Sequence, residues 1–328
     1  MELRLRTRLT ERLDIAHPIL NAPMGFAAGG KLAAAVTAAG GLGLIGGGYG
    51  DTAWLEREFA AAGNARVGCG FITWSLAENP ALLDEALAHA PAAVMLSFGD
   101  PRPFADAVKA AGSALICQVQ TLAMAQAALD CGADILIAQG TEAGGHGASR
   151  ATSTLVPEVA DLLGARGSDA LLVAAGGIAD GRGLAAALML GADGVLAGSR
   201  FWASTEALVH SNHHNAALAA TGDDTIRQIV TDIARQYAWP TEFTARVLKN
   251  AFTERWHGNE AELRARAEAF SMTYYAGVAA GDPDNVGVWV GEAAGLIREI
   301  VPAGDIVTSM VEQAARLLRN AGGMLLRS

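Results

Sequence analysis

Cysteine is scarce in this chain of 328 residues, where only Cys69, Cys117 and Cys131 occur. An odd number of cysteines without zinc-ribbon spacing argues against a disulfide framework and against a cysteine-based metal site. Basic runs are absent as well, and 24 Lys and Arg against 34 Asp and Glu give a net charge of −10. This charge argues against nucleic acid and against an anionic membrane surface as partners. A reducing, cytoplasmic compartment is the simplest expectation.

Aromatic residues make up only 6% of the chain, whereas hydrophobic residues reach 51% and glycine occurs 39 times. This composition predicts a large core with many close backbone approaches. Residues 1–14 are too densely charged for a signal peptide. The one long uncharged stretch, Leu32 to Gly50, consists mostly of Ala and Gly. It predicts a buried helix, turn and strand in place of a membrane span.

Short apolar runs alternate with Ala-rich helical patterns over the first two hundred residues, and each run is apolar on both faces, as in a parallel strand covered on both sides. The predicted strands are His17–Met24, Gly41–Gly48, Arg66–Ile72, Ala92–Gly99, Ala114–Gln120, Asp134–Gly140, Leu171–Gly177 and Gly194–Phe201. The predicted helices include Lys31–Ala39, Trp54–Ala62, Pro80–His89, Pro103–Ala111, Ala123–Cys131 and Gly183–Leu190. This order predicts an α/β fold, a (β/α)8 TIM barrel. A doubly wound open sheet would leave two runs without a place.

The pattern changes after Phe201. His210 to Ala280 predicts helices of mixed charge, Ala261–Phe270 among them, and no strands. Ser309–Leu318 is amphipathic and is expected to be the final barrel helix. We therefore expect a barrel made of residues 1–209 and 296–328, with a helical subdomain, residues 210–295, inserted before the last helix and covering the active site.

Glycines follow the last two predicted strands, where barrels bind phosphate through backbone N–H groups. Gly176 and Gly177 follow the seventh, and Gly198 with Ser199 follows the eighth. Two such turns at this pair of strands predict a ligand that carries a phosphate. The stretch Gly41 to Gly46 also matches G-x-G-x-x-G, but a helical pattern precedes it and its glycines lie within a predicted strand, so a dinucleotide site is not expected.

His146 lies in the glycine-rich stretch Gln139 to Gly147, at the carboxyl end of the sixth predicted strand, where a barrel places its chemistry. The flanking glycines predict a sterically free, unburied imidazole that exchanges a proton near neutral pH. His146 is therefore the candidate catalytic residue. No carboxylate or cysteine stands at ligand spacing from His210, His213 and His214, which predicts a solvated helix start and no metal site.

With these positions assembled, the chain resembles the nitronate monooxygenases, once called 2-nitropropane dioxygenases, over nearly its whole length. The resemblance is carried by Asn21 to Gly25, by the Glu-Ala-Gly-Gly-His core of Gln139 to Gly147, by Ala175 to Gly183 and by Val286 to Ile297. The flavin-dependent enoyl-ACP reductases are similar in nearly the same loops. Two positions depart from the pattern: Gly70 stands where many relatives have Asn, and Gln118 where some have Lys.

The resemblance implies FMN as the cofactor, with the phosphate near the glycine turns, the flavin ring near Ala22 to Met24, and Gln118 donating to the N1–C2=O edge of the ring. The implied cofactor-binding residues are Ala22, Pro23, Met24, Gln118, Gln139, Gly144, Gly145, Gly176, Gly177, Leu196, Ala197, Gly198 and Ser199. A hydrogen-bond donor at that edge stabilises the negative charge of reduced flavin.

The implied reaction is oxidation of a nitronate or nitroalkane with O2 to a carbonyl compound and nitrite, with His146 as the base that removes the α-proton. Tyr274, Tyr275 and Trp289 are expected to close over the pocket. Three alternatives remain: an NAD(P)H-dependent flavin reductase of a quinone or enoyl thioester, a non-redox phosphate-binding barrel enzyme, and a flavin-binding protein without turnover. A homodimer is the default expectation for assembly.

Overall fold

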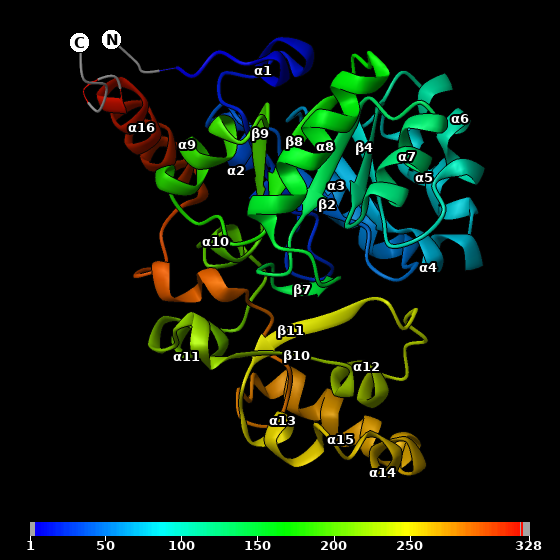
Figure 1. Ribbon diagram of the computed structural model, residues 1–328. Helices are drawn as coiled ribbons and strands as arrows, with labels where there is room; N and C mark the ends of the chain where they lie inside the picture. Colours follow the sequence, from blue (N-terminus) through cyan, green and yellow to red (C-terminus); the bar gives the residue numbers. More distant parts are fainter. Residues whose placement is uncertain (1–3, 322, 324–328) are drawn as a thin grey trace.

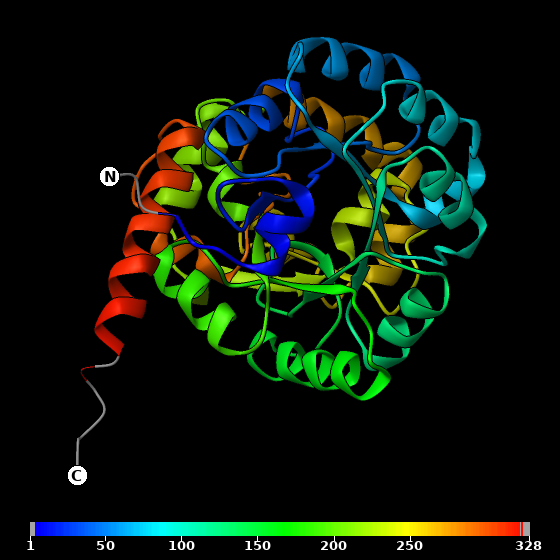
Figure 2. The same cartoon turned by 90° about the horizontal axis from the view of Figure 1, so that it is seen from above.

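The computed structural model describes residues 4–321 and 323. Its central sheet has eight parallel strands in the order β1-β9-β8-β6-β5-β4-β3-β2, and a parallel bridge between Leu20 and Leu42 joins the two edges. Viewed from above, the helices form a ring around these strands (Figure 2). The predicted TIM barrel is therefore confirmed. Its strands are β1 (Ile19–Asn21), β2 (Leu44–Gly46), β3 (Gly68–Ile72), β4 (Ala93–Ser97), β5 (Ala114–Val119), β6 (Ile135–Gln139), β8 (Leu171–Ala175) and β9 (Gly194–Ala197).

Each barrel strand lies inside one of the apolar runs that predicted it, and the predicted helices occur between them. The uncharged stretch from Leu32 to Gly50 folds as most of α2 (Gly30–Ala38), a turn and β2. The helix α8, with Pro157 in its second turn, was not among the helices named from the sequence. The barrel-side helices are α1 (Arg8–Leu13), α2 (Gly30–Ala38), α3 (Thr52–Ala62), α4 (Thr73–Glu78), α5 (Ala81–Ala88), α6 (Arg102–Ala110), α7 (Leu122–Asp130), α8 (Thr152–Arg166), α9 (Gly181–Met189), α10 (Ser199–Trp202) and α16 (Ala303–Ala321).

Alternation along the strands sorts the core into two layers and positions the site. In β6, Ile135 and Ile137 pack inside the barrel, whereas Leu136 and Ala138 pack against the surrounding helices. Because successive side chains of a strand point to opposite faces, Gln139 continues the inward row. The last inward positions of the strands therefore face the barrel mouth, and the same rule brings Gln118 of β5 there.

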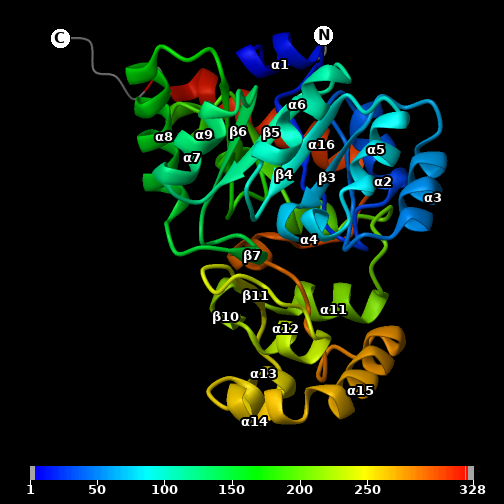
Figure 3. The ribbon, with the colours of Figure 1, turned by 90° about the vertical axis from the view of Figure 1, so that its right-hand side faces the viewer.

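A lobe of smaller elements, residues 210–295, lies beyond the carboxyl ends of the barrel strands (Figures 1 and 3). Its largest buried cluster includes Trp256, Leu263 and Tyr274. Its elements are α11 (Ser211–Ala219), β10 (Thr225–Gln228), α12 (Val230–Arg235), β11 (Thr244–Leu248), α13 (Ala251–Trp256), α14 (Glu260–Ala265), α15 (Ala267–Ala280) and the 3-10 turns η1 (Gly222–Asp224) and η2 (Glu292–Leu296).

Two sequence-based expectations for the lobe are wrong. It contains the strands β10 and β11, which pair antiparallel, and β11 also pairs with β7 (Gly145–Gly147) in the loop after β6. Arg227 and Arg246 are cross-strand partners, and these charges obscure the apolar alternation that identifies a strand. The helix expected over Ala261–Phe270 is broken at Arg266, whose φ of −116° and ψ of 4° separate α14 from α15.

Among the helices of the described residues, none has both the length and the apolar content needed to cross a bilayer. All three cysteines are free thiols, and Cys69 and Cys117 are buried among apolar side chains.

Candidate active site

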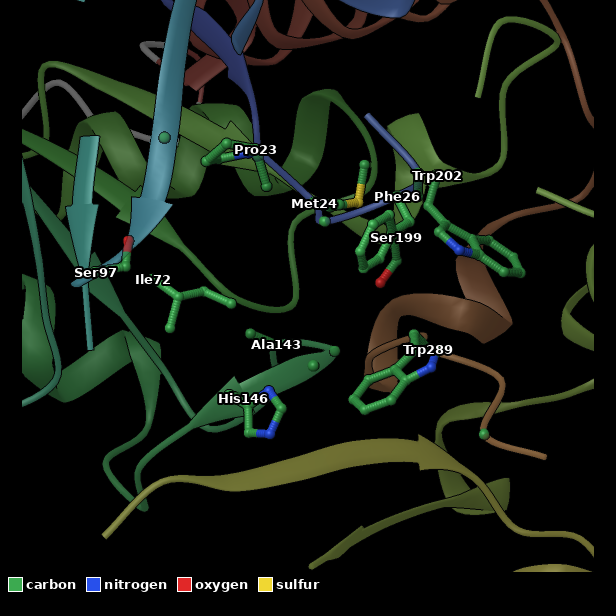
Figure 4. Close-up of a pocket in the computed structure, with 18 of the residues that line it drawn as sticks. Pro23, Met24, Phe26, Ile72, Ser97, Ala143, His146, Ser199, Trp202 and Trp289 are labelled. Atoms are coloured by element: carbon green, nitrogen blue, oxygen red, sulfur yellow. The ribbon is translucent and has the colours of Figure 1, made fainter. Parts of the chain in front are cut away.

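A cavity of about 610 Å³ opens between the carboxyl ends of the barrel strands and the lobe. Its volume is in the range of cofactor and substrate sites. Pro23, Met24 and Ser199 lie on one side of it, and His146 lies on the other (Figure 4). The structure brings every predicted site residue to its wall except Ala197, whose carbonyl oxygen accepts a hydrogen bond from the N–H of Ala22 at 2.9 Å.

Gly70 is a close-packing position in the middle of β3. A Cβ atom at this residue would lie 2.4 Å from Cγ of Pro23 and 2.7 Å from its Cβ. Because the proline ring is rigid, any side chain here would displace Pro23 from the cavity wall. Pro23 can therefore occupy its position at the barrel mouth only because residue 70 is a glycine, where many relatives have Asn.

The glycine turns after β8 and β9 form a cradle of backbone donors. Gly177 has a φ of +72°, a conformation that side chains other than glycine rarely adopt. The N–H groups of Gly177, Gly198 and Ser199 donate no hydrogen bond to another residue within 4–321. The hydroxyl oxygen of Ser199 accepts from the N–H of Gly291 at 2.8 Å, so its own O–H is free to donate.

Three glutamine amides and the His146 backbone form a hydrogen-bonded chain at the ends of β5 and β6. Oε1 of Gln139 accepts from Nε2 of Gln118 at 3.2 Å and from Nε2 of Gln120 at 2.9 Å. Nε2 of Gln139 donates to the carbonyl oxygen of His146 at 3.0 Å. Gln139 is therefore tied to the His146 loop, while Gln118 keeps one N–H for a ligand in the cavity.

The His146 ring is buried, contrary to the free ring expected from its glycine neighbours: the residue is 8% exposed. It stacks on Trp239, with ring centroids 3.3 Å apart and planes inclined by 4°. Its Nε2 lies 2.9 and 3.0 Å from the two carboxylate oxygens of Asp232. Burial lowers the pKa of His146 below its usual value, and Asp232 opposes part of that shift. The imidazole is therefore neutral at pH 7.

Asp232 decides which ring nitrogen of His146 is the proton acceptor. A carboxylate beside Nε2 selects the tautomer with the proton on Nε2. Nδ1 then carries a lone pair, and it has no hydrogen bond to the rest of the described chain. Asp232 could not be identified from the sequence, because it lies 86 residues from His146 and belongs to a short helix of the lobe.

Two arginines of the lobe, the half-buried Arg227 and the buried Arg246, hold the loop that carries His146. Arg227 donates to the carbonyl oxygens of Gly147 at 3.2 Å and Thr244 at 2.6 Å, and to Oγ1 of Thr141 at 2.9 Å. Arg246 donates to the carbonyl oxygen of Thr141 at 3.0 Å. Burial lowers the pKa of Arg227 to about 10, which still leaves it charged at neutral pH. The lobe thus holds the loop of residues 141–147 through charge-assisted hydrogen bonds.

Aromatic rings cover the lobe side of the cavity. Tyr49 and Tyr237 stack with centroids 3.9 Å apart, and Trp289 lies 5.7 Å from the His146 ring. Tyr274, Tyr275 and Trp289, which were expected to close the pocket, all line it. The cavity is also lined by four residues that were not identified from the sequence: Tyr49, Tyr237, Trp239 and Arg235. Single aromatic or basic residues in helical or loop segments belong to no recognisable motif.

The histidines at the start of α11 are not simply solvated. His210 and His213 line the cavity, and Nε2 of the buried His214 donates to the carbonyl oxygen of Trp202 at 2.9 Å. No group of three or more His, Cys, Asp or Glu side chains within 4–321 could hold a metal ion.

The chain is similar over most of its length to known proteins, both in sequence and in structure. The family model for nitronate monooxygenase matches residues 6–66 and 76–313. Nitronate monooxygenase npaC of Metarhizium robertsii is 35% identical over 92% of this chain and 91% of that protein, and a nitronate monooxygenase of Neurospora crassa is 31% identical over 92% and 90%.

Among solved structures, FabK from Thermotoga maritima superposes with a TM-score of 0.85 at 31% identity, covering 98% of this chain and 100% of FabK. Nitroalkane oxidase from Streptomyces ansochromogenes superposes with a TM-score of 0.77 at 26% identity, covering 95% and 99%. On the match to the family model and on the identity to these two fungal proteins, the chain belongs to the nitronate monooxygenase family.

Proposed function

We propose that this protein oxidises nitronates and nitroalkanes with FMN and O2 to carbonyl compounds and nitrite, with His146 as the base. The observation that carries the proposal is the buried, neutral imidazole whose Nε2 is held by Asp232 at 2.9 Å, so that Nδ1 is left to take a proton inside the cavity. Family membership and the similarity to nitroalkane oxidase support the substrate class.

The donor set of the cavity is suited to FMN. A phosphate needs several N–H donors within reach, and Gly177, Gly198 and Ser199 offer unpaired N–H groups beside the free O–H of Ser199. We assign the phosphate to these residues with Gly176 and Leu196, while Ala197 acts through its hydrogen bond to Ala22. The flavin ring is assigned to Ala22, Pro23, Met24, Gln118, Gln139, Gly144 and Gly145. When bound, the flavin supplies electron-transfer chemistry that no side chain provides.

Proton transfer falls to the His146–Asp232 pair. Nδ1 of His146 accepts the α-proton of a neutral nitroalkane, which gives the nitronate in place. The imidazolium formed keeps its Nε2–H on the Asp232 carboxylate, so the new charge is compensated at 2.9 Å. Stacking on Trp239 fixes the ring plane, and the surrounding aromatic rings exclude water from the site.

A reductase using NAD(P)H is the second candidate, favoured by the similarity to FabK. Anaerobic visible spectroscopy of the purified protein separates the two activities. Under the proposed function, propionate 3-nitronate changes the flavin spectrum and NADH leaves it unchanged. Rapid bleaching by NADH alone would assign the protein to the reductases, and a protein without a flavin spectrum would contradict the cofactor assignment.

A further inference from the structure

The loop after β2 places Tyr49 in the wall of the cavity. Gly48 and Gly50 flank it with φ values of +64° and +89°, so the loop turns sharply on both sides of the tyrosine. The phenol ring stacks on Tyr237, with centroids 3.9 Å apart and planes inclined by 6°. The guanidinium carbon of Arg235 lies 5.1 Å from the centre of the same ring. These contacts fix the position of the phenol oxygen.

The oxygen of Tyr49 accepts hydrogen bonds from two neighbours. Nε1 of Trp239 donates to it at 3.3 Å, and the guanidinium of Arg235 donates to it as well. These two donors occupy the acceptor side of the phenol oxygen and leave its O–H to donate. Within residues 4–321 and 323, neither of these hydrogen bonds uses that O–H. Because Tyr49 lines the cavity, its O–H is available to a ligand there.

The surroundings of Tyr49 keep the phenol neutral and polarise it. Burial raises the pKa of Tyr49 above its usual value, and the nearby cation of Arg235 opposes part of that shift. The phenol is therefore protonated at neutral pH and can donate a hydrogen bond, which a phenolate cannot do. A charged donor on the phenol oxygen also strengthens the hydrogen bond that the O–H makes in turn.

One indole connects Tyr49 to His146. The ring of Trp239 stacks on the imidazole with centroids 3.3 Å apart, and its N–H donates to the phenol oxygen at 3.3 Å. In a nitroalkane, each nitro oxygen is two bonds from the carbon that loses the proton, so a base and a donor acting on one molecule must be close neighbours. Removal of the proton moves negative charge onto these oxygens, where a fixed donor stabilises it.

We propose that Tyr49 donates its O–H to a nitro oxygen of the substrate and stabilises the charge that develops there when His146 takes the α-proton. The inference rests on the proposed function and deepens it. The C–H bond breaks, its proton goes to Nδ1 of His146, and its electron pair forms the C=N bond of the nitronate. The displaced N=O electron pair moves onto the oxygen that faces Tyr49. Arg235 is a positioning residue in this step, because its guanidinium acts through the phenol oxygen.

The test is Tyr49→Phe, which keeps the aromatic ring and its stacking on Tyr237 and removes only the hydroxyl. Steady-state kinetics are measured with nitroethane and with its preformed nitronate, per bound flavin. A neutral nitro group is a weak acceptor, so we expect kcat for nitroethane to fall about 10- to 100-fold while its KM stays within about twofold. The preformed nitronate is charged before it reacts, so its KM should rise about tenfold. Equal changes for the two forms would overturn the inference.

Two further variants separate this role from a loss of packing. Thr308→Val removes an exposed hydroxyl of α16, far from the cavity wall, and should leave all four constants unchanged. Arg235→Gln should show the same pattern as Tyr49→Phe, but with smaller changes. In the Tyr49→Phe background it should have no further effect on that pattern, because the oxygen through which the guanidinium acts is gone. Additive effects of the two substitutions would contradict the positioning role of Arg235.

Binding of nitrate provides a readout that needs no turnover. Nitrate is a planar anion with its oxygens on nitrogen, like the nitro end of a nitronate, and its Kd is measured by calorimetric titration. We expect the Kd to rise about tenfold in Tyr49→Phe and to stay the same in Thr308→Val. This result supports the donor assignment even if the wild type oxidises neither form of nitroethane and the proposed function fails. Equal affinity in wild type and Tyr49→Phe, or no binding of nitrate to the wild type, would overturn the inference, while oxidation of nitroethane by the wild type would leave the proposed function intact.

Discussion

At the scale of single residues, the chemistry of the site depends on how Asp232 and Trp239 constrain His146. Their contacts to the ring fix its tautomer and its plane. A glycine-flanked histidine in a loop would otherwise sample many orientations, most of them unproductive. The sequence identifies the histidine, whereas the residues that orient its ring and would let it act as the proposed base come from distant parts of the chain.

Replacement of Asp232 tests this dependence. In Asp232→Asn, the side-chain amide can donate to Nε2 and drive the proton to Nδ1, so we expect kcat/KM for neutral nitroethane to fall about 10²- to 10⁴-fold. Its preformed nitronate needs no base and should lose much less. Steady-state kinetics with both substrates measures the difference, with the exposed Asp223→Asn as the control. An equal loss for both forms would show that Asp232 serves folding and not proton transfer.

Burial of His146 also couples its protonation to stability. Because its pKa is lower in the folded protein than in the unfolded chain, the unfolded chain binds the extra proton first as the pH falls. The free energy of unfolding should therefore fall as the pH drops through the usual histidine pKa near 6.5, and level off below the lowered value. Urea denaturation at several pH values should show a smaller acid-induced loss in His146→Gln than in wild type.

Some pH dependence will remain in that variant, since burial also lowers the pKa values of His213 and His214. An identical pH profile in wild type and His146→Gln would contradict the assignment of a neutral, buried imidazole.

At the scale of elements, the barrel strands could be predicted because each is buried on both faces and reads as a continuous apolar run. β10 and β11 could not, because Arg227 and Arg246 occupy paired positions within them. Both arginines donate to carbonyl oxygens of the 141–147 loop, which belongs to another part of the chain and which no local pattern reveals. Asp232 and Arg235 could not be predicted as site residues either. Their neighbours in the site are brought to them by tertiary packing, which leaves no local sequence pattern.

The hydrogen bonds from Arg227 to the carbonyl oxygens of Gly147 and Thr244 give a prediction at the scale of elements. Arg227→Gln leaves the carbonyl oxygens of Gly147 and Thr244 without their charged donor, so we expect a loss of about 2–4 kcal/mol in the free energy of unfolding. Hydrogen exchange at residues 143–147 should accelerate and kcat should fall, although His146 is unchanged. The exposed Arg298→Gln is the matched control. Unaltered hydrogen exchange at residues 143–147 would show that Arg227 does not hold this loop in place.

At the scale of the whole molecule, the cavity lies between two parts of the fold, so a ligand that fills it stabilises both. FMN at about 100 times its dissociation constant should add about 2.7 kcal/mol to the free energy of unfolding. Thermal unfolding of the protein with FMN and after its removal measures this gain. Gly177→Asp, which places a carboxylate in the phosphate cradle, should unfold at the same temperature with and without FMN. A gain of the same size in that variant would place the phosphate elsewhere.

The pairing of β7 with β11 has a consequence for recombination between relatives. Because residues 145–147 complete the three-stranded sheet of the lobe, residues 210–295 do not form an exchangeable cassette by themselves. A chimera with crossovers only near residues 210 and 295 would combine the lobe of one relative with the His146 loop of another. The strand pairing that places Ala245 opposite His146 would then join segments from two different proteins. Functional hybrids must carry residues 139–152 along with the lobe, as a second, separate graft.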